Sequence, residues 1–299
     1  GYFRPIFPGQ LAQLCRHLLS PGEQTQIFRL QRGPVIAQGH RYHGIGIHRC
    51  IQLLEIIRRL GHRHPQDIDI ADMEQLLDMV QRVRDITGKP VGIKTAIGGW
   101  HFMNDLTEEV ARRGLTAAPD FIAIDGGEGG SGAAPQALAD HMALSIDEAL
   151  PRVVDSLIES NLRHRVRLIA AGKLLTPARV AWALSAGADF INTARGFMFS
   201  LGCIQALRCH ANTCPTGITT HNERLQRGLV VEDKAERVAY YCANMNKEID
   251  MIAHSCGLLH AREFRREHVR IVQASGQSVA LNVLYPYPVA PPAEGLISV

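Results

Sequence analysis

The stretch Phe121-Ile-Ala-Ile-Asp-Gly-Gly-Glu-Gly-Gly-Ser-Gly132 joins a short apolar segment directly to a glycine-rich loop. Four apolar residues bounded by Pro119-Asp120 and by glycine are typical of a buried strand. Apolar residues at helical spacing precede and follow it, and they predict helices at residues 104–113 and 146–161. A buried strand between two amphipathic helices favours an α/β fold with a parallel sheet.

The same strand–helix unit occurs four times. Further apolar strands are predicted at residues 90–94, 166–170 and 190–193, and further helices at 70–84 and 177–186. Glycines 88, 114 and 187 follow three of the helices, as expected at helix ends. Such alternation requires parallel strands with helices outside the sheet, and four units are half of a (β/α)8 TIM barrel.

The strand ends of a barrel carry its chemistry. Five glycines follow the second strand, Gly126, Gly127, Gly129, Gly130 and Gly132, and they allow its backbone to approach a ligand closely. The loop is neither a Walker loop nor a Gly-x-Gly-x-x-Gly fingerprint. A ligand-binding loop and a simple flexible turn both remain open from glycine content alone.

Charged residues stand at the other three strand ends. Lys94 ends the first predicted strand, and an ammonium there could serve a flavin or a substrate carboxylate, or be an ordinary surface charge. The third and fourth strands run into Gly172-Lys173 and Arg195-Gly196. Loops after the last two strands of such barrels commonly bind a phosphate, so these four residues are candidates for a phosphate site. Alternatively, the two glycines serve only as strand-to-helix turns.

Three cysteines lie in one short segment after the fourth strand. Cys203, Cys209 and Cys214 are separated by five and four residues, and Pro215 follows the last. Three thiolates in one loop favour an iron–sulfur cluster, and three ligands favour the 3Fe–4S type. The alternatives are buried thiols that act as small hydrophobes, or a zinc site with His210 as the fourth ligand.

Several segments together resemble the FMN-binding domain of glutamate synthase: the cysteine run, the preceding Ala194-Arg-Gly-Phe-Met198 and the two glycine-rich loops. The likeness is closest to short stand-alone proteins that lack the amidotransferase domain. The likeness runs from about His62 to about Tyr285. It implies that the four units are the C-terminal half of an FMN-dependent barrel. It also implies that Lys94 and the glycine loop line the flavin pocket, and that Gly172, Lys173, Arg195 and Gly196 hold the FMN phosphate.

The resemblance implies a reaction and its partners. Electrons from reduced ferredoxin or from an NAD(P)H-oxidising subunit would pass through the cluster to FMN, and the imine of 2-oxoglutarate and ammonia would be reduced to L-glutamate. Ammonia would come from another source, such as glutamine hydrolysed by a partner subunit. The alternatives are a related amine-transferring enzyme, a non-catalytic iron–sulfur or flavin electron-transfer subunit, or an inactive fragment.

Composition supports a soluble cytoplasmic protein. The 299 residues carry a net charge of +3, which does not favour a nucleic-acid partner. No apolar run reaches the roughly 18 residues of a membrane span. Seven cysteines, an odd number, argue against a secreted disulfide framework and favour a reducing compartment.

The first part of the chain differs in composition. From Gly1 to Gln66 there is no Lys and no Asp, against nine Arg, six His and eight Gln. We therefore expect an atypical segment at residues 1–60, a barrel portion with the cysteine loop at 61–217, and a helical extension with a Pro-rich tail at 218–299. At about 30 residues per strand–helix unit, the first segment has room for two units, so we expect an incomplete barrel that needs a partner or oligomer.

Overall fold

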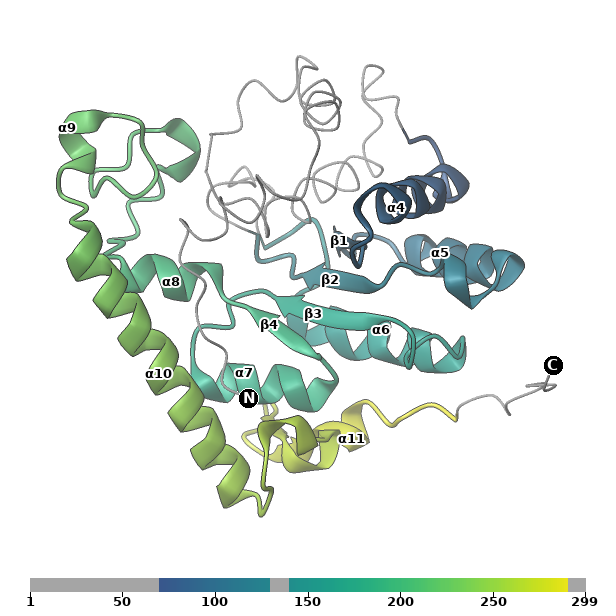
Figure 1. Ribbon diagram of the computed structural model, residues 1–299. Helices are drawn as coiled ribbons and strands as arrows, with labels where there is room; N and C mark the ends of the chain where they lie inside the picture. Colours follow the sequence, from purple (N-terminus) through teal and green to yellow (C-terminus); the bar gives the residue numbers. More distant parts are fainter. Residues whose placement is uncertain (1–69, 130–139, 290–299) are drawn as a thin grey trace. The chain divides into compact units, whose positions relative to one another are not determined.

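A computed structural model describes residues 70–129 and 140–289, all within one compact unit (Figure 1). The atypical segment 1–60 lies outside these residues, as do Gly130, Gly132 and the end of the Pro-rich tail. The expectations for those parts, including the incomplete barrel, stay predictions.

A four-stranded parallel sheet organises the described part of the chain. Its strands are β1 (Gly92–Ala96), β2 (Phe121–Asp125), β3 (Arg167–Ala171) and β4 (Phe190–Asn192), in the spatial order β1-β2-β3-β4. This confirms the predicted α/β class and parallel pairing, whereas closure into a barrel stays a prediction.

Helices provide the crossovers between these strands. Helix α4 (Met73–Thr87) precedes β1, and α5 (His101–Arg113), α6 (Ile146–Glu159) and α7 (Pro177–Ala186) connect the four strands in order (Figure 1). Local chemistry sets the helix ends. The Asp72 carboxylate accepts a hydrogen bond from the Gln75 amide at 2.8 Å, and Gly88 ends α4 in the left-handed region at φ 59°. The predicted helices are therefore confirmed to within about three residues.

The two faces of the sheet differ in burial. Ile93, Ile122 and Leu168 are fully buried on the face that packs against the helices. Lys94 and Ile169 point to the other face and are only half-buried. Strand β3 shows the period of two expected when one face packs against helices, whereas three consecutive residues of β2, Ile122 to Ile124, are buried.

Strand β1 ends two residues later than the sequence predicts. It continues through Thr95 and Ala96, so Lys94 lies within the strand rather than at its end. Thr95 is buried, with its hydroxyl bonded to the Ala96 carbonyl at 3.2 Å, so this β-branched residue extends the strand.

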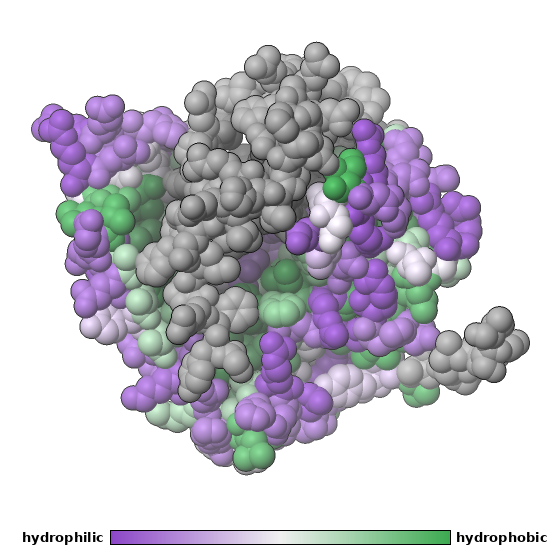
Figure 2. Space-filling model, viewed as in Figure 1, coloured by the Kyte–Doolittle hydropathy of each residue, from purple (hydrophilic) through white to green (hydrophobic). Residues whose placement is uncertain are grey.

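Charged side chains join α4 and α5 on the outside. Arg113 contacts Asp78 of α4 at 2.6 Å, and Arg112 contacts Glu74 at 3.4 Å. Both arginines also pair with Glu109 on their own helix, and the hydrogen bonds they donate lower the pKa of Glu109 to about 2. Figure 2 shows mostly hydrophilic surface over these two helices.

The described chain beyond the sheet contains further helices, and it packs back on the sheet's helices. Helix α8 (Ala194–Ser200) follows β4, and the long α10 (Val231–Ser255) contacts both α7 and α8 (Figure 1). No helix in the described ranges is both long and apolar enough to cross a membrane. The smaller elements are η2 (Leu115–Ala117), η3 (Cys209–Ala211), α9 (Glu223–Gln226), η4 (Ala261–Glu263), η5 (Arg266–His268), the antiparallel pair β5 (Arg270–Val272) and β6 (Ser278–Ala280), and α11 (Leu281–Leu284).

A fully buried arginine holds this C-terminal part to α6. The Arg266 guanidinium contacts the Asp155 carboxylate at 2.6 Å and donates to the Pro151 carbonyl at 3.2 Å and to the Tyr285 carbonyl at 2.8 Å. Its planar group also lies 4.4 Å from the centre of the Tyr287 ring. One side chain therefore connects α6, η5 and the segment after α11.

We expect Arg266→Ala to reduce the free energy of unfolding by about 3 kcal/mol, because it removes a buried charge from its partners and leaves Asp155 without its cation. Denaturant titration of the full chain measures this loss. Arg270→Ala, which removes an exposed arginine bonded only to Ser278, is the control and should cost about 0.5 kcal/mol or less. Equal losses in the two variants would contradict the prediction.

Candidate functional site

An ion pair lies on the half-buried face of the sheet. Lys94 Nζ of β1 is 2.7 Å from Asp125 Oδ2 at the end of β2, and each side chain is about one third exposed (33% and 31%). Asp125 was not among the predicted site residues. The signal for it was its position as the last residue before the glycine loop. The pair places one cation and one anion where a ligand at the strand ends can reach both.

The first part of the glycine loop is fixed by backbone hydrogen bonds. The Gly126 amide donates to the Ala171 carbonyl of β3 at 2.8 Å, and the Gly127 amide donates to the Leu144 carbonyl at 2.7 Å. The Leu144 amide in turn donates to the Ile97 carbonyl beyond β1 at 2.8 Å. A side chain at Gly126 or Gly127 would collide with neighbouring atoms. These two glycines are therefore required for close packing, which a simple flexible turn would not need.

The loop itself carries a carboxylate, Glu128, that the sequence analysis did not single out. The Ile146 amide at the start of α6 donates to both oxygens of Glu128, at 3.2 and 3.3 Å. Glu128 therefore caps α6 from a position 18 residues earlier in the chain. A glutamate inside a glycine run gave no local signal, because its partner lies on another element.

Cationic residues gather after β3 and β4. Gly172 and Lys173 have φ values of 146° and 47°, and Lys173 Nζ contacts Asp140 Oδ1 at 2.8 Å. The hydrogen bond from Lys173 lowers the pKa of the Asp140 carboxyl, and the nearby charges of His141 and Arg195 lower it further. The predicted Lys173 therefore contacts this carboxylate directly, and Arg195 acts on it through its charge.

Gly196 lies inside α8 rather than at a free loop. It is buried, and a side chain there would collide with the Tyr241 hydroxyl of α10. That hydroxyl donates to the Leu175 carbonyl at 3.1 Å, and the Tyr241 ring packs edge-to-face on Phe197 at 5.5 Å. Close packing of α8 on α10 thus accounts for this glycine, while its role in phosphate binding stays a prediction.

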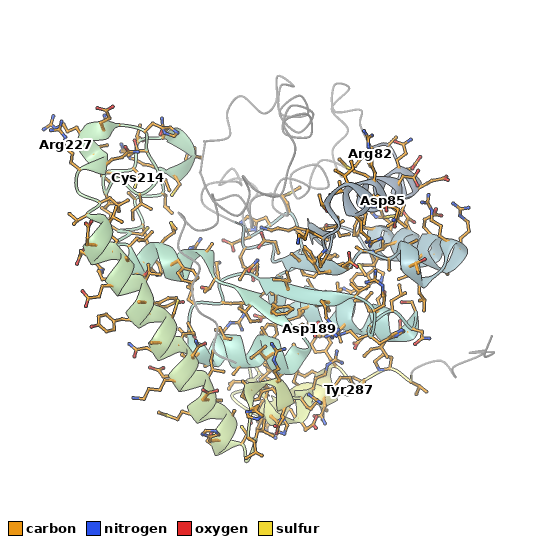
Figure 3. The ribbon with its side chains drawn as sticks, in the orientation of Figure 1. Arg82, Asp85, Asp189, Cys214, Arg227 and Tyr287 are labelled. Atoms are coloured by element: carbon orange, nitrogen blue, oxygen red, sulfur yellow. The ribbon has the colours of Figure 1, made fainter. Side chains whose placement is uncertain are left out.

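The cysteine loop runs from α8 to α9. Cys203 follows α8, Cys209 begins η3, and Cys214 is buried in the loop before α9 (Figure 3). Within the described residues, no three His, Cys, Asp or Glu side chains are grouped closely enough to hold a metal ion. The iron ligand set therefore stays a prediction, and so does the zinc alternative with His210.

Cys214 nevertheless has the character of a thiolate. Desolvation by burial raises its pKa, but hydrogen bonds from Thr216 and Thr219 outweigh it and lower the pKa to about 6. The Thr216 hydroxyl is 3.2 Å from the sulfur. A thiolate is the form that binds iron, so the chemistry of this donor fits a cluster. Of the described cysteines outside the loop, Cys242 is half-buried and Cys256 is exposed. A packing role therefore fits Cys242 and does not fit Cys256.

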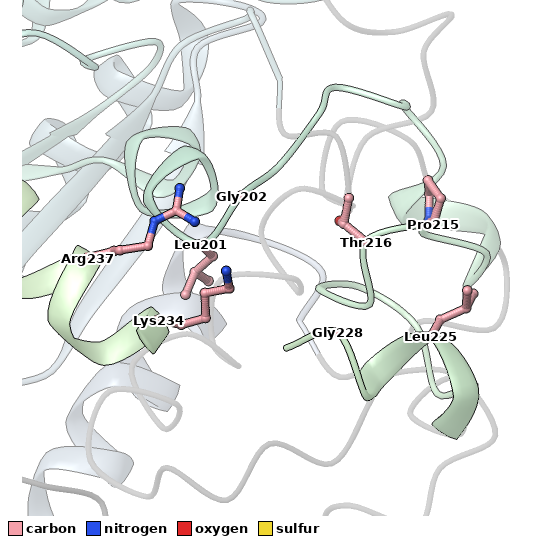
Figure 4. Close-up of a pocket in the computed structure, with 8 residues that line it drawn as sticks. All are labelled: Leu201, Gly202, Pro215, Thr216, Leu225, Gly228, Lys234 and Arg237. Carbon is pink, nitrogen blue, oxygen red and sulfur yellow. The ribbon is translucent and has the colours of Figure 1, made fainter. Parts of the chain in front are cut away.

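A pocket of about 340 Å³ adjoins the cysteine loop (Figure 4). Lys234 and Arg237 of α10 extend toward Leu201 and Gly202 on one side. Pro215, Thr216, Leu225 and Gly228 complete the lining. Lys234 already pairs with the neighbouring Asp233 at 2.8 Å.

Comparison with known proteins identifies relatives of this chain. Residues 63–259 match the family described as the conserved region in glutamate synthase. The glutamate synthase large subunit-like protein YerD of Bacillus subtilis is 41% identical over 217 residues, which are 72% of this chain and 41% of that protein. The archaeal-type glutamate synthase (NADPH) of Thermotoga maritima is 31% identical over 210 residues, 70% of this chain and 40% of that protein. The chain thus spans about two fifths of the length of these curated relatives.

We expect Gly196→Val to reduce the free energy of unfolding by about 2 kcal/mol, because the added side chain meets Tyr241 in a packed contact. Tyr241→Leu removes the ring that it meets, so the double variant should lose less than the sum of the two single losses. Denaturant titration of the four proteins measures this coupling. Simple additivity would contradict the contact.

Proposed function

The chain belongs to the glutamate synthase conserved-region family, and on this premise we propose that it is an FMN-dependent oxidoreductase that reduces the imine of 2-oxoglutarate and ammonia to L-glutamate. The supporting observation is the arrangement at the carboxyl ends of the parallel strands. The Lys94–Asp125 pair lies at the ends of β1 and β2, the fixed glycine loop follows β2, and Lys173 and Arg195 follow β3 and β4. Ligands of α/β sheets bind at this edge.

The loops after β3 and β4 fit a phosphate group. Lys173 contacts the exposed Asp140 carboxylate, and the charge of Arg195 also acts on that carboxylate, so both cations supply positive charge to this place. Successive positive φ angles at Gly172 and Lys173 also turn the backbone sharply at this place. We propose that Lys173 and Arg195 would hold the FMN phosphate.

Lys94 fits a role beside the reacting groups. Its ammonium can donate a hydrogen bond to a substrate carboxylate or to the electron-rich N1–C2 edge of the flavin. Asp125 holds the ammonium at 2.7 Å and so fixes its direction before a ligand arrives. When bound, FMN would supply the hydride chemistry, and the chain would supply binding, orientation and charge.

The overall reaction balances with one two-electron donor. Ammonia condenses with the keto group of 2-oxoglutarate and releases water, and the resulting imine then accepts a hydride at carbon and a proton at nitrogen, which together are two electrons and two protons. The relative from Thermotoga maritima carries NADPH in its name, which supports a nicotinamide donor, and reduced ferredoxin is the alternative. We propose that partner proteins supply the electrons and the ammonia.

For the cluster, the donor atoms fit but their described arrangement does not form a metal site. We therefore assign no step to it. We propose that Cys203, Cys209 and Cys214 hold a 3Fe–4S cluster in the loaded protein.

Two measurements on the anaerobically purified full chain test the function. The visible spectrum reports flavin and cluster together, and glutamate formation is assayed from 2-oxoglutarate and ammonium with a chemically reduced viologen as donor. Flavin binding with glutamate formation supports the proposal. Flavin binding without glutamate formation favours a related amine-transferring enzyme, and the absence of both would overturn the proposal.

We expect Lys173→Ala to weaken FMN binding about tenfold, which corresponds to about 1.4 kcal/mol. The reason is the loss of one of two cations next to the proposed phosphate. Flavin fluorescence titration measures the affinity. The control is Lys89→Ala, an exposed lysine before β1 at the opposite edge of the sheet, which should leave the affinity unchanged. Equal effects would place the phosphate elsewhere.

Cys209→Ser should lower iron and sulfide content to less than half of the wild-type value, because serine replaces one of three thiolate ligands. Iron and acid-labile sulfide analysis of anaerobic protein measures this. Cys256→Ser, which removes an exposed cysteine outside the loop, should retain both. Full iron retention in Cys209→Ser would remove that residue from the ligand set.

A further inference from the structure

Glu128 is a half-buried carboxylate near the carboxyl ends of the strands, and it accepts a backbone amide from another element. Both oxygens accept the Ile146 amide at the start of α6, at 3.2 and 3.3 Å. An acceptor at this position satisfies an amide that has no partner within the helix. It also places negative charge at the positive end of the α6 dipole, where charge is favourable.

The glycines around this carboxylate leave it room. A Cβ at Gly126 would collide with the Glu128 carboxylate, and a Cβ at Gly172 would come within 3.1 Å of Glu128 Oε2 and 2.9 Å of Ile146 Cβ. The side chain therefore fills the space between the ends of β2, β3 and α6. Gly126 and Gly172, two of the glycines expected to contact a cofactor, are thus close to this glutamate.

The same residue is part of a loop that is fixed on both sides. Gly126 is tied to β3 through the Ala171 carbonyl, and Gly127 both donates to Leu144 and accepts from the Asp140 amide, each at 2.7 Å. Asp140 is the carboxylate that contacts Lys173. Glu128 is therefore linked to the proposed phosphate site by a series of contacts. Its neighbour Gly127 is hydrogen-bonded to Asp140, and Asp140 contacts Lys173.

We propose that Glu128 is a positioning residue, whose carboxylate anchors the glycine-rich loop to the N-terminus of α6 and thereby holds Gly127 and Asp140 in place beside the anion-binding cations. The inference rests on the proposed function for the identity of the ligand, FMN. It assigns Glu128 a role separate from ligand contact. It also implies that the N-terminus of α6 is occupied by this carboxylate and does not bind the phosphate.

Two substitutions separate the hydrogen bond from the charge. Glu128→Gln keeps an oxygen that can accept the Ile146 amide, whereas Glu128→Ala removes the acceptor and leaves a space under the loop. Glu148→Ala is the matched control, because it removes a carboxylate from the same first turn of α6 that pairs only with the exposed Arg152.

Hydrogen exchange of the full chain without added flavin gives the first readout. In Glu128→Ala the amides of Gly126, Gly127 and Ile146 should exchange at least tenfold faster, whereas Glu128→Gln should stay within about threefold of wild type. Unchanged exchange in Glu128→Ala, or equal acceleration in Glu148→Ala, would overturn the proposal.

Flavin titration gives the second readout. FMN affinity should fall about tenfold in Glu128→Ala and recover most of this loss in Glu128→Gln. Loosened amides with unchanged affinity would overturn the role in the binding site. If the wild-type chain binds no FMN, the proposed function fails, and the exchange measurement still decides whether Glu128 anchors the loop.

Discussion

The parallel register of β1 to β4 is the constraint on which the remaining features depend. Ala96, Asp125, Ala171 and Asn192 are paired in one row across the sheet, and each is the last residue of its strand. Because all four strands end at one level, the loops that follow them emerge side by side. Lys94 and Arg195, just over a hundred positions apart in the sequence, thus reach the same edge of the sheet.

Glycine at these loops serves packing as much as binding. Gly126 and Gly172 make room for Glu128, and Gly196 makes room for Tyr241. A glycine-rich sequence is often interpreted as a cradle for a phosphate, but here protein atoms occupy the space next to these three residues. The cations Lys173 and Arg195, rather than the glycines, are the more specific indication of an anion site.

The C-terminal part is attached by contacts of two kinds. Helix α10 packs against α7 and α8, and the buried Arg266 connects η5 to α6 and to the residues after α11. The cysteine loop lies between α8 and α10 in sequence, so the packing of these two helices limits where its ends can be. In this chain, helix packing thus links the end of the sheet to the cysteine loop.

Much of the fold was determined by local sequence. The apolar strands, the helix from Pro177 to Ala186 and the terminating glycines are encoded by periodicity and capping, because these effects act over a few residues, and the structure agrees with them closely. The end of β1 was misjudged by two residues, because Thr95 is held in the strand by burial. The candidate residues Lys94, Lys173 and Arg195 could be found because they lie within or just after apolar strands. Only the tertiary structure decided their partners: Asp125 for Lys94, Asp140 for Lys173, Ile146 for Glu128 and Tyr241 next to Gly196. Those partners lie on other elements, and strand register and helix packing, which no local pattern encodes, bring them together.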